Sequence, residues 1–269
     1  MHSLQLSWPQ EAISQALSPF WPEFVVEAVP QLDSTNTALL ERARSGHTMP
    51  VLLVTEKQTA GRGRMGRQRH NTQPAGGMLA FSLGLPLPAC DLSGLSLVVA
   101  CSVVNSLDAQ QRHGLRIKWP NDLWLGSSKL GGILVEICSQ GAQRYAVIGV
   151  GINITEPLPL PPAAANQPTQ QPPAWVQQFA PQASAPDVLA LVAAPLAAAV
   201  HQFTQRGFTP WQSRFMARDA LAGQAVRLSD GDTGVVQGVN AQGALLLQTA
   251  RGVRTVLSDE ISVRPQGLC

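Results

Sequence analysis

The order of apolar and polar residues in the first 155 positions predicts a mixture of helices and strands. Residues 33–36 (Asp-Ser-Thr-Asn) are all of types that cap helix N-termini, and the segment that follows to Ala43 predicts a helix. Residues 92–112 are mostly apolar and predict a long buried helix, whereas residues 1–30 are only weakly patterned. Short runs rich in Val, Ile and Leu predict strands at about residues 51–57, 78–85, 115–119, 130–138 and 145–154.

The composition changes after residue 155. Nine of the 21 prolines lie between residues 155 and 186, with many Ala and Gln, so we expect an insertion without regular structure. Helices are predicted at residues 185–205 and 210–217. Short strands separated by turns then predict a small β-barrel, at residues 225–229, 234–239, 244–249 and 253–257. The chain therefore divides into a larger domain, residues 1–218, and a smaller one, residues 219–269.

Composition narrows the class of protein. An apolar share of 45% in 269 residues is ample for a core, and a net charge of +2 argues against a dedicated nucleic-acid coat. Four cysteines show no paired spacing and no metal-ligand pattern, and no signal peptide precedes them, so we expect reduced thiols in a cytoplasmic protein. Residues 188–200 are apolar but too short to cross a bilayer, so no membrane partner is expected.

A loop rich in Gly and Arg is the strongest chemical signal. Residues 57–90 contain no Asp or Glu, and within them Thr59–Arg67 reads Thr-Ala-Gly-Arg-Gly-Arg-Met-Gly-Arg. Glycines let a backbone curl and expose its N–H groups, and guanidinium groups bind anionic oxygens in pairs. The loop is therefore suited to hold an anion.

The loop also spells the dinucleotide-binding pattern at Gly61, Gly63 and Gly66. That pattern needs a strand directly before the first glycine and a helix after the last one. Here six residues separate Gly61 from the apolar run Val51–Val54 of the predicted strand, and residues 68–74 do not open a helix. No Gly-Lys-Ser/Thr sequence occurs either, so a P-loop is excluded together with the dinucleotide site.

Lysine usage gives a second clue. The chain has only three lysines, Lys57, Lys118 and Lys129, against sixteen arginines. Lys118 and Lys129 each open one of the chain's unusual short motifs, Lys-Trp-Pro-Asn-Asp and Lys-Leu-Gly-Gly. A compact ammonium group suits a single anionic oxygen where a planar guanidinium does not, so these two lysines are candidates for chemistry.

Five motifs together resemble those of biotin protein ligases (biotin–[acetyl-CoA-carboxylase] ligases). They follow one another over about 120 residues, at Asp33–Asn36, Gln58–Arg64, Lys118–Asp122, Lys129–Glu136 and Gly149–Asn153. The resemblance implies an α+β fold in which a mixed sheet with helices, related to class II aminoacyl-tRNA synthetases, is followed by an SH3-like barrel. Only about thirty residues precede Asp33, so we expect the ligase-only type without an N-terminal helix-turn-helix.

The resemblance also implies a reaction and its substrates. Such a ligase joins biotin to ATP as biotinyl-5′-AMP and then transfers biotin to a lysine of a biotin carboxyl carrier protein. Biotin, ATP and Mg²⁺ are thus the expected small molecules, with the carrier protein of acetyl-CoA carboxylase as partner. No DNA-binding role is expected, and the sequence leaves a homodimer open.

Site residues follow from the same resemblance. Arg62, Gly63 and Arg64 are expected to fold over biotin and the adenylate, and Lys129 to meet the carboxylate and phosphate oxygens. Asp122 is a candidate for orienting Lys129 or the incoming lysine, or for acting as a base, and these alternatives stay open. The biotin-binding residues are expected to be Ser34, Thr35, Asn36, Gln58, Thr59, Gly61, Gly63, Arg64, Met65, Lys129 and Gly132. The adenylate-binding residues are expected to be Arg62, Arg64, Arg67, Trp119, Asn121 and Asn153, and no protein metal ligands are expected.

Two departures from the family pattern concern the loop. Met65 stands where many relatives have another arginine, which removes one cation near the adenylate. After Arg67 the usual aromatic residue is missing, so a guanidinium or imidazole group could stack on adenine instead.

Two alternative functions remain open at this stage. A lipoate ligase shares the fold and the adenylate chemistry, although the Gly/Arg loop and the Lys-Trp-Pro-Asn-Asp run favour biotin. A nucleic-acid-binding protein could grip phosphates with the same loop. It would need a wider basic surface and exposed aromatic residues, and residues 219–269 contain no Trp, Tyr or Phe.

Overall fold

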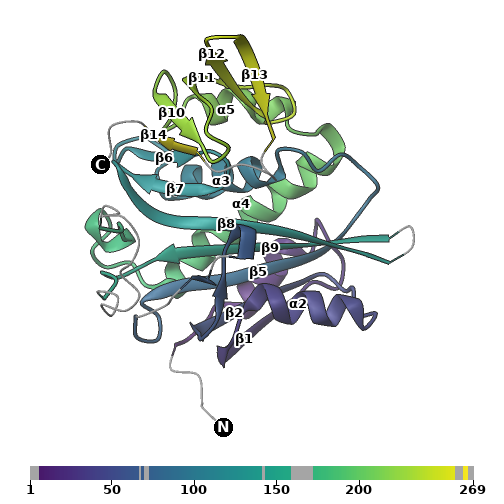
Figure 1. Cartoon of the computed structure of the whole chain (residues 1–269). Helices are drawn as coiled ribbons and strands as arrows, with labels where there is room; N and C mark the ends of the chain where they lie inside the picture. The colour runs from purple at the N-terminus through teal and green to yellow at the C-terminus, as the bar shows by residue number, and fades with distance from the viewer. Residues whose placement is uncertain are drawn as a thin grey trace.

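The structure, a computed structural model, describes residues 6–66, 68–69, 73–140, 143–158, 172–257 and 263–265. Within them a seven-stranded sheet carries helices on both faces, and a five-stranded sheet lies at one end of the molecule (Figure 1). The mixed α+β class that the sequence predicted is confirmed.

The large sheet is mostly antiparallel. Only β1 and β2 pair in parallel, and every other neighbouring pair is antiparallel. In spatial order its strands are β1 (Val25–Leu32), β2 (Val51–Gln58), β5 (Met78–Leu87), β9 (Gln143–Asn153), β8 (Ser128–Gln140), β7 (Asp122–Leu125) and β6 (Leu115–Lys118).

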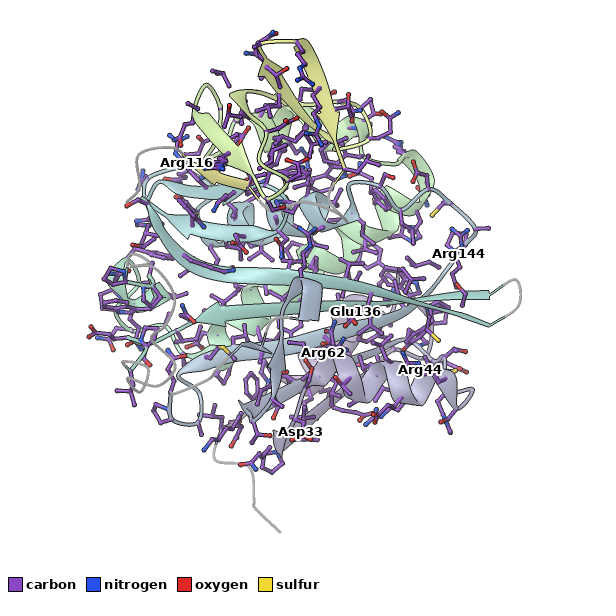
Figure 2. The ribbon with its side chains drawn as sticks, in the orientation of Figure 1. Asp33, Arg44, Arg62, Arg116, Glu136 and Arg144 are labelled. Atoms are coloured by element: carbon purple, nitrogen blue, oxygen red, sulfur yellow. The ribbon has the colours of Figure 1, made fainter. Side chains whose placement is uncertain are left out.

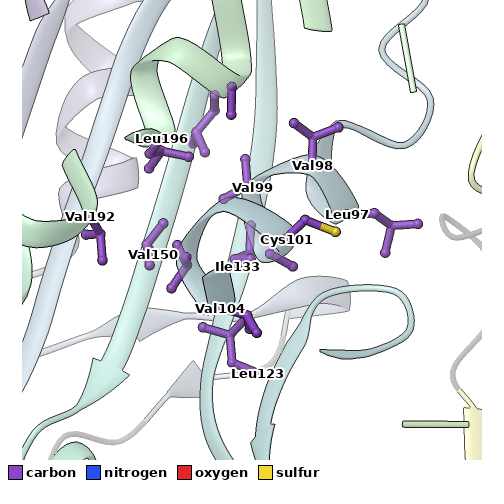
Figure 3. Close-up of a cluster of buried hydrophobic side chains, with 14 of the residues drawn as sticks. Leu97, Val98, Val99, Cys101, Val104, Leu123, Ile133, Val150, Val192 and Leu196 are labelled. Carbon is purple, nitrogen blue, oxygen red and sulfur yellow. The ribbon is translucent and has the colours of Figure 1, made fainter. Parts of the chain in front are cut away.

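Successive side chains of a strand point to opposite faces of the sheet, and the two faces pack against different helices. Leu52 and Val54 pack into the main core with α1 (Gln10–Leu17), α3 (Leu95–Leu107) and α4 (Ala185–Arg206). Val51 and Leu53, one position out of phase, pack with α2 (Thr35–Arg44) in a smaller cluster. Figure 3 shows part of the main core, where α3 and α4 side chains meet those of β7, β8 and β9.

The main core encloses one apolar helix and one cysteine of note. Among the described residues, α4 alone is long and apolar enough to cross a membrane, and half of its apolar window is buried within the molecule.

Burial raises the pKa of the Cys101 thiol to about 12, against weaker opposing effects of Arg214 and Arg218. Cys101 is therefore a packed apolar side chain rather than a reactive thiol.

The C-terminal sheet is antiparallel, and side-chain contacts connect it to the rest of the molecule. Its strands, in spatial order, are β13 (Gly252–Val256), β12 (Leu245–Thr249), β11 (Thr233–Val239), β10 (Ala225–Leu228) and β14 (Val263–Pro265). The Trp119 indole N–H donates to the Gly243 carbonyl at 3.0 Å. Buried Arg218 pairs with Asp108 at 3.0 Å and fixes the segment before this sheet. The 3-10 helix η4 (Thr209–Trp211) and α5 (Gln212–Met216) precede this sheet along the chain.

Several predicted elements differ in extent. The helix predicted at residues 92–112 ends at Leu107, because the Asp108 carboxylate accepts the N–H groups of His113 and Leu115 and turns the chain. No element was predicted at the positions of α1, β1, β7 or β14.

The expectation of an irregular segment at residues 155–186 is only partly testable. Residues 159–171 lie outside the described part of the chain, and η3 (Val176–Gln178) forms one 3-10 turn in the remainder.

Candidate active site

The start of α2 forms one wall of the site. Ser34 caps the helix, its hydroxyl accepting the Thr37 N–H at 3.4 Å. Gln58, at the end of β2, accepts from the Thr35 N–H at 2.8 Å and from the Thr35 hydroxyl at 3.2 Å. All of these except Thr37 are buried, so the structure brings predicted biotin-binding residues from two motifs into one polar cluster.

Asn36 extends this cluster onto the sheet. Its amide nitrogen donates to the Leu134 carbonyl at 3.2 Å and to Glu136 Oε2 at 2.9 Å. Its amide oxygen accepts from the Ser82 hydroxyl at 2.6 Å. A Cβ atom at Gly149 would lie 2.1 Å from that oxygen, so only glycine lets the Asn36 amide rest on β9. The orientation of this amide is therefore fixed.

The Gly/Arg loop lies over the same face of the sheet. Arg62, in the two-residue strand β3 (Gly61–Arg62), forms an ion pair with Glu136 on β8, with Nη1 3.1 Å from Oε1 (Figure 2). Thr59, the first residue of the loop, donates its hydroxyl to Asp33 at 2.5 Å. The loop is thus tied to the end of β1 and to the middle of the sheet.

The rest of the loop is described in part. Strand β3 pairs with β4 (Gln68–Arg69), and η1 (Arg64–Gly66) contains Arg64 and Met65. Arg67, the predicted adenylate contact, lies outside the described residues.

Glycine residues leave room over the floor of the site, which is the face of β8 and β9 that carries α2. Every second residue of β8 lies on this face, and these residues include Gly132, Leu134 and Glu136. Gly149 of β9 pairs with Leu134. Gly131 faces the other way, and a Cβ atom there would lie 2.5 Å from the Gly151 carbonyl oxygen. Close packing against β9, rather than room for a ligand, therefore accounts for Gly131.

Lys129 and Asp122 meet at the other end of this floor. The Lys129 ammonium lies 2.6 Å from Asp122 Oδ1, and about half of the lysine side chain is exposed. A Cβ atom at Gly132 would lie 3.5 Å from that oxygen and 3.6 Å from the ammonium. The predicted catalytic lysine and acid are therefore brought together beside a predicted ligand-binding glycine.

Asn121 and Asn153 hold the backbone around Lys129. Asn121 donates from its side chain to the Ile133 carbonyl at 2.7 Å, and its own carbonyl accepts the Ile133 N–H. Asn153 is buried and donates to the Ala174 carbonyl, while the Ala174 N–H donates to the Lys129 carbonyl. Both asparagines position segments next to the site.

Trp119 is not brought to the site. It is 1% exposed, and its only ring donor is used on the Gly243 carbonyl. The ring is enclosed in the main core, so it offers no exposed face on which an adenine could stack.

The site contains functional candidates that the sequence analysis did not name. Ser82 comes from a buried strand with no signal beyond its polarity. Glu136 was visible as the last residue of the Lys129 motif, and its even spacing from Gly132 placed it on the same face of the strand.

The arrangement is suited to an elongated ligand with a polar head and an anionic tail. Donors and acceptors gather at the start of α2, and the cations Arg62 and Lys129 lie further along the same face. Among the described residues, no group of three His, Cys, Asp or Glu side chains could hold a metal ion.

Two family models match this chain. The Biotin/lipoate A/B protein ligase family model matches residues 28–153, which include the whole site, and the Biotin protein ligase C terminal domain model matches residues 222–264. The bifunctional ligase/repressor BirA of Escherichia coli is 34% identical over 89% of this chain and 74% of its own length. The chain belongs to the biotin protein ligase family.

Further relatives support this assignment. The biotin–[acetyl-CoA-carboxylase] ligase of Paracoccus denitrificans is 32% identical over 85% of this chain and 96% of its own. The structure of the Aquifex aeolicus biotin protein ligase in complex with biotin and ATP superposes with a TM-score of 0.73. It is 25% identical and covers 89% of this chain and 98% of its own. The predicted family and the predicted enzyme class, a biotin ligase, are confirmed.

Proposed function

We propose that this ligase activates biotin with ATP and transfers it to a lysine of the biotin carboxyl carrier protein of acetyl-CoA carboxylase. The observation that carries the proposal is the alignment, on one face of the sheet, of the Ser34–Asn36 cluster, the Arg62 guanidinium and the Lys129 ammonium. This order matches a ligand with a ureido head, an apolar chain and a carboxylate. Two relatives named as biotin ligases favour biotin over lipoate.

In the first step a biotin carboxylate oxygen attacks the α-phosphorus of ATP, and the bond to the pyrophosphate oxygen breaks. Two anions must approach one another, so fixed positive charge along their path stabilises the transition state. Arg62 and Lys129 supply that charge, and the loop glycines Gly61 and Gly63 allow close approach of backbone donors. In the same proposal Arg64 contacts both biotin and the adenylate, Met65 contacts biotin, and Arg67 contacts the adenylate.

In the second step the carrier lysine nitrogen attacks the biotinyl carbonyl carbon, AMP leaves, and the nitrogen loses a proton. Asp122 is held by Lys129 at the edge where the amine would arrive. Its proposed role is to fix Lys129, and its spare oxygen is an acceptor for the incoming amine. Asn121 and Asn153 contribute by holding the surrounding backbone.

Mg²⁺ is proposed to arrive with the triphosphate. The described residues offer no cluster of three or more ligands, which fits a cation coordinated mainly by phosphate oxygens. It would neutralise charge on the leaving pyrophosphate.

The finer features of the fold belong to the same proposal. We propose a class II synthetase-like catalytic domain over residues 1–218 and an SH3-like barrel over residues 219–269. We also propose that the protein is cytoplasmic and does not bind DNA. It could act as a monomer or as a homodimer.

The proposal is tested by supplying a biotin carboxyl carrier domain and MgATP with either biotin or lipoate. We expect biotin on the carrier lysine, detected as a mass increase, and no lipoate transfer. Transfer of lipoate but not biotin, or of neither, would overturn it.

A further inference from the structure

Glu136 joins the two ends of the site. One carboxylate oxygen accepts from the Asn36 amide at 2.9 Å, and the other pairs with the Arg62 guanidinium at 3.1 Å. Asn36 belongs to the cluster at the start of α2, and Arg62 belongs to the Gly/Arg loop.

We propose that Glu136 is a positioning residue that couples the head-binding cluster to the loop. The effect of Glu136 on biotin binding rests on the proposed function. The anchoring of the loop by Glu136 does not depend on that function. Glu136 itself is not expected to touch the reacting atoms.

The chemistry of the two neighbours explains why a carboxylate is needed. Asn36 presents its NH₂ group to Glu136, because its amide oxygen is turned towards the Ser82 hydroxyl. Arg62 has donors only. Both neighbours therefore donate, and an ionised carboxylate offers an acceptor oxygen to each. A glutamine offers one acceptor and one donor, so it can satisfy Asn36 or Arg62 but not both.

The Asn36 amide has little freedom to adapt. Its second hydrogen is donated to the Leu134 carbonyl, and Gly149 lies directly beneath its oxygen. A rotation of the amide would place its nitrogen against the Ser82 hydroxyl and its oxygen against the Glu136 carboxylate. Because Asn36 is fixed, the position of Glu136 is fixed as well, and with it the point at which Arg62 is anchored.

The ion pair also leaves Arg62 available to a substrate. Glu136 engages Nη1, and the side chain of Arg62 is 44% exposed. A guanidinium group has further N–H donors, so Arg62 can stay on Glu136 and still bind an anionic oxygen. Glu136 thus holds the loop cation in place before a ligand arrives.

The test uses Glu136→Gln, which keeps the shape of the side chain. Trypsin cleavage after Arg62 and Arg64 is measured in the unliganded protein, and biotin affinity is measured by calorimetry. Loss of a charge-assisted contact predicts about 10-fold faster cleavage and a biotin Kd about 10- to 100-fold higher. The melting temperature should stay close to that of the wild type.

Glu27→Gln is the matched control. Glu27 pairs with Arg42 at 2.9 Å, also between a strand and a neighbouring element, and both side chains are partly exposed. Its loss should leave cleavage of the loop and biotin affinity within about twofold, as expected for a surface pair.

A double variant tests the coupling. If Glu136 acts through Arg62, adding Glu136→Gln to Arg62→Gln should not accelerate cleavage after Arg64 any further. Should Glu136→Gln fail to fold, Glu136→Asp replaces it, since it keeps both acceptors but reaches one methylene less far and should loosen the loop.

The outcomes separate this proposal from the proposed function. Faster cleavage in Glu136→Gln without any biotin ligase activity of the wild type would support the anchor and overturn the function. Unchanged cleavage and unchanged biotin affinity, or an equal loss of every parameter together with the melting temperature, would overturn the role of Glu136.

Discussion

Lys129 and Asp122 form an ion pair of 2.6 Å between the adjoining strands β7 and β8. The contact lies next to Gly132, where the absence of a side chain leaves room for a ligand beside the ammonium. The pair therefore presents a positioned cation at an open surface, which is what a reaction between two anions requires.

Replacing Lys129 should affect the chemistry far more than the fold. In Lys129→Ala we expect biotinyl-AMP formation to slow by on the order of 10²–10³, because one preorganised charge is lost. Lys129→Arg should also be poor, since a planar fork does not occupy a point-charge position. Single-turnover rates at saturating ATP, with melting curves beside them, measure both effects. A rate within a few-fold of wild type in Lys129→Ala would place the chemistry elsewhere.

Asp122→Asn separates two roles of that residue. If Asp122 acts by holding Lys129, both half-reactions should slow by about 10-fold, the loss expected for one charge-assisted hydrogen bond. Adenylation and transfer from preformed biotinyl-AMP are measured separately. A loss confined to transfer would instead identify Asp122 as the base for the carrier lysine.

Trp119→Phe tests where the indole acts. The change removes the hydrogen bond to the Gly243 carbonyl and leaves a small cavity, so we expect a loss of about 1–3 kcal/mol in the free energy of unfolding. The KM for ATP should remain within about twofold, because no ring face is exposed at the site. Weaker ATP binding at unchanged stability would show that Trp119 contacts the adenylate, as predicted from the sequence.

Asp219 predicts an unusual pH dependence of stability. Burial raises the pKa of its carboxyl from 3.8 to about 6, against opposing effects of the Leu221 N–H and of Arg116. Among the described residues Oδ2 has no hydrogen-bond partner. The folded state thus retains a proton that the unfolded chain has released. The stability from this group is fully present below pH 3.8 and is lost as the pH rises through about 6.

Asp219→Asn should therefore stabilise the protein at neutral pH. We expect a gain of about 1–3 kcal/mol at about pH 8 and little change near pH 4, since two pKa units correspond to about 3 kcal/mol. Urea unfolding at both pH values measures it. An equal effect at both values would show that the Asp219 carboxyl does not titrate differently in the folded state.

The sequence predicted the parts of the fold that local chemistry determines. The cap at Ser34 and the apolar runs of β2, β5, β8 and β9 carry their own signals, and the structure has them. Strand β1 carries a weak signal because Glu27 and Pro30 interrupt its apolar residues. It is an edge strand, and β2 is its only strand partner among the described residues.

The candidate site was predictable as a set of residues but not as a geometry. Nothing local distinguishes Trp119 as a packing residue, since its partner Gly243 lies 124 positions away in the chain. Glu136 could have been placed beside Gly132 by the two-residue repeat of a strand, yet its contacts with Asn36 and Arg62 depend on tertiary structure.

Formation of the adenylate tests the account most directly. The full-length protein is incubated with biotin and MgATP in the absence of a carrier, and the products are separated and identified by mass spectrometry. The account predicts biotinyl-AMP and an equal amount of pyrophosphate, with the yield strongly reduced in Lys129→Ala. Folded wild-type protein that produces no biotinyl-AMP under these conditions would contradict it.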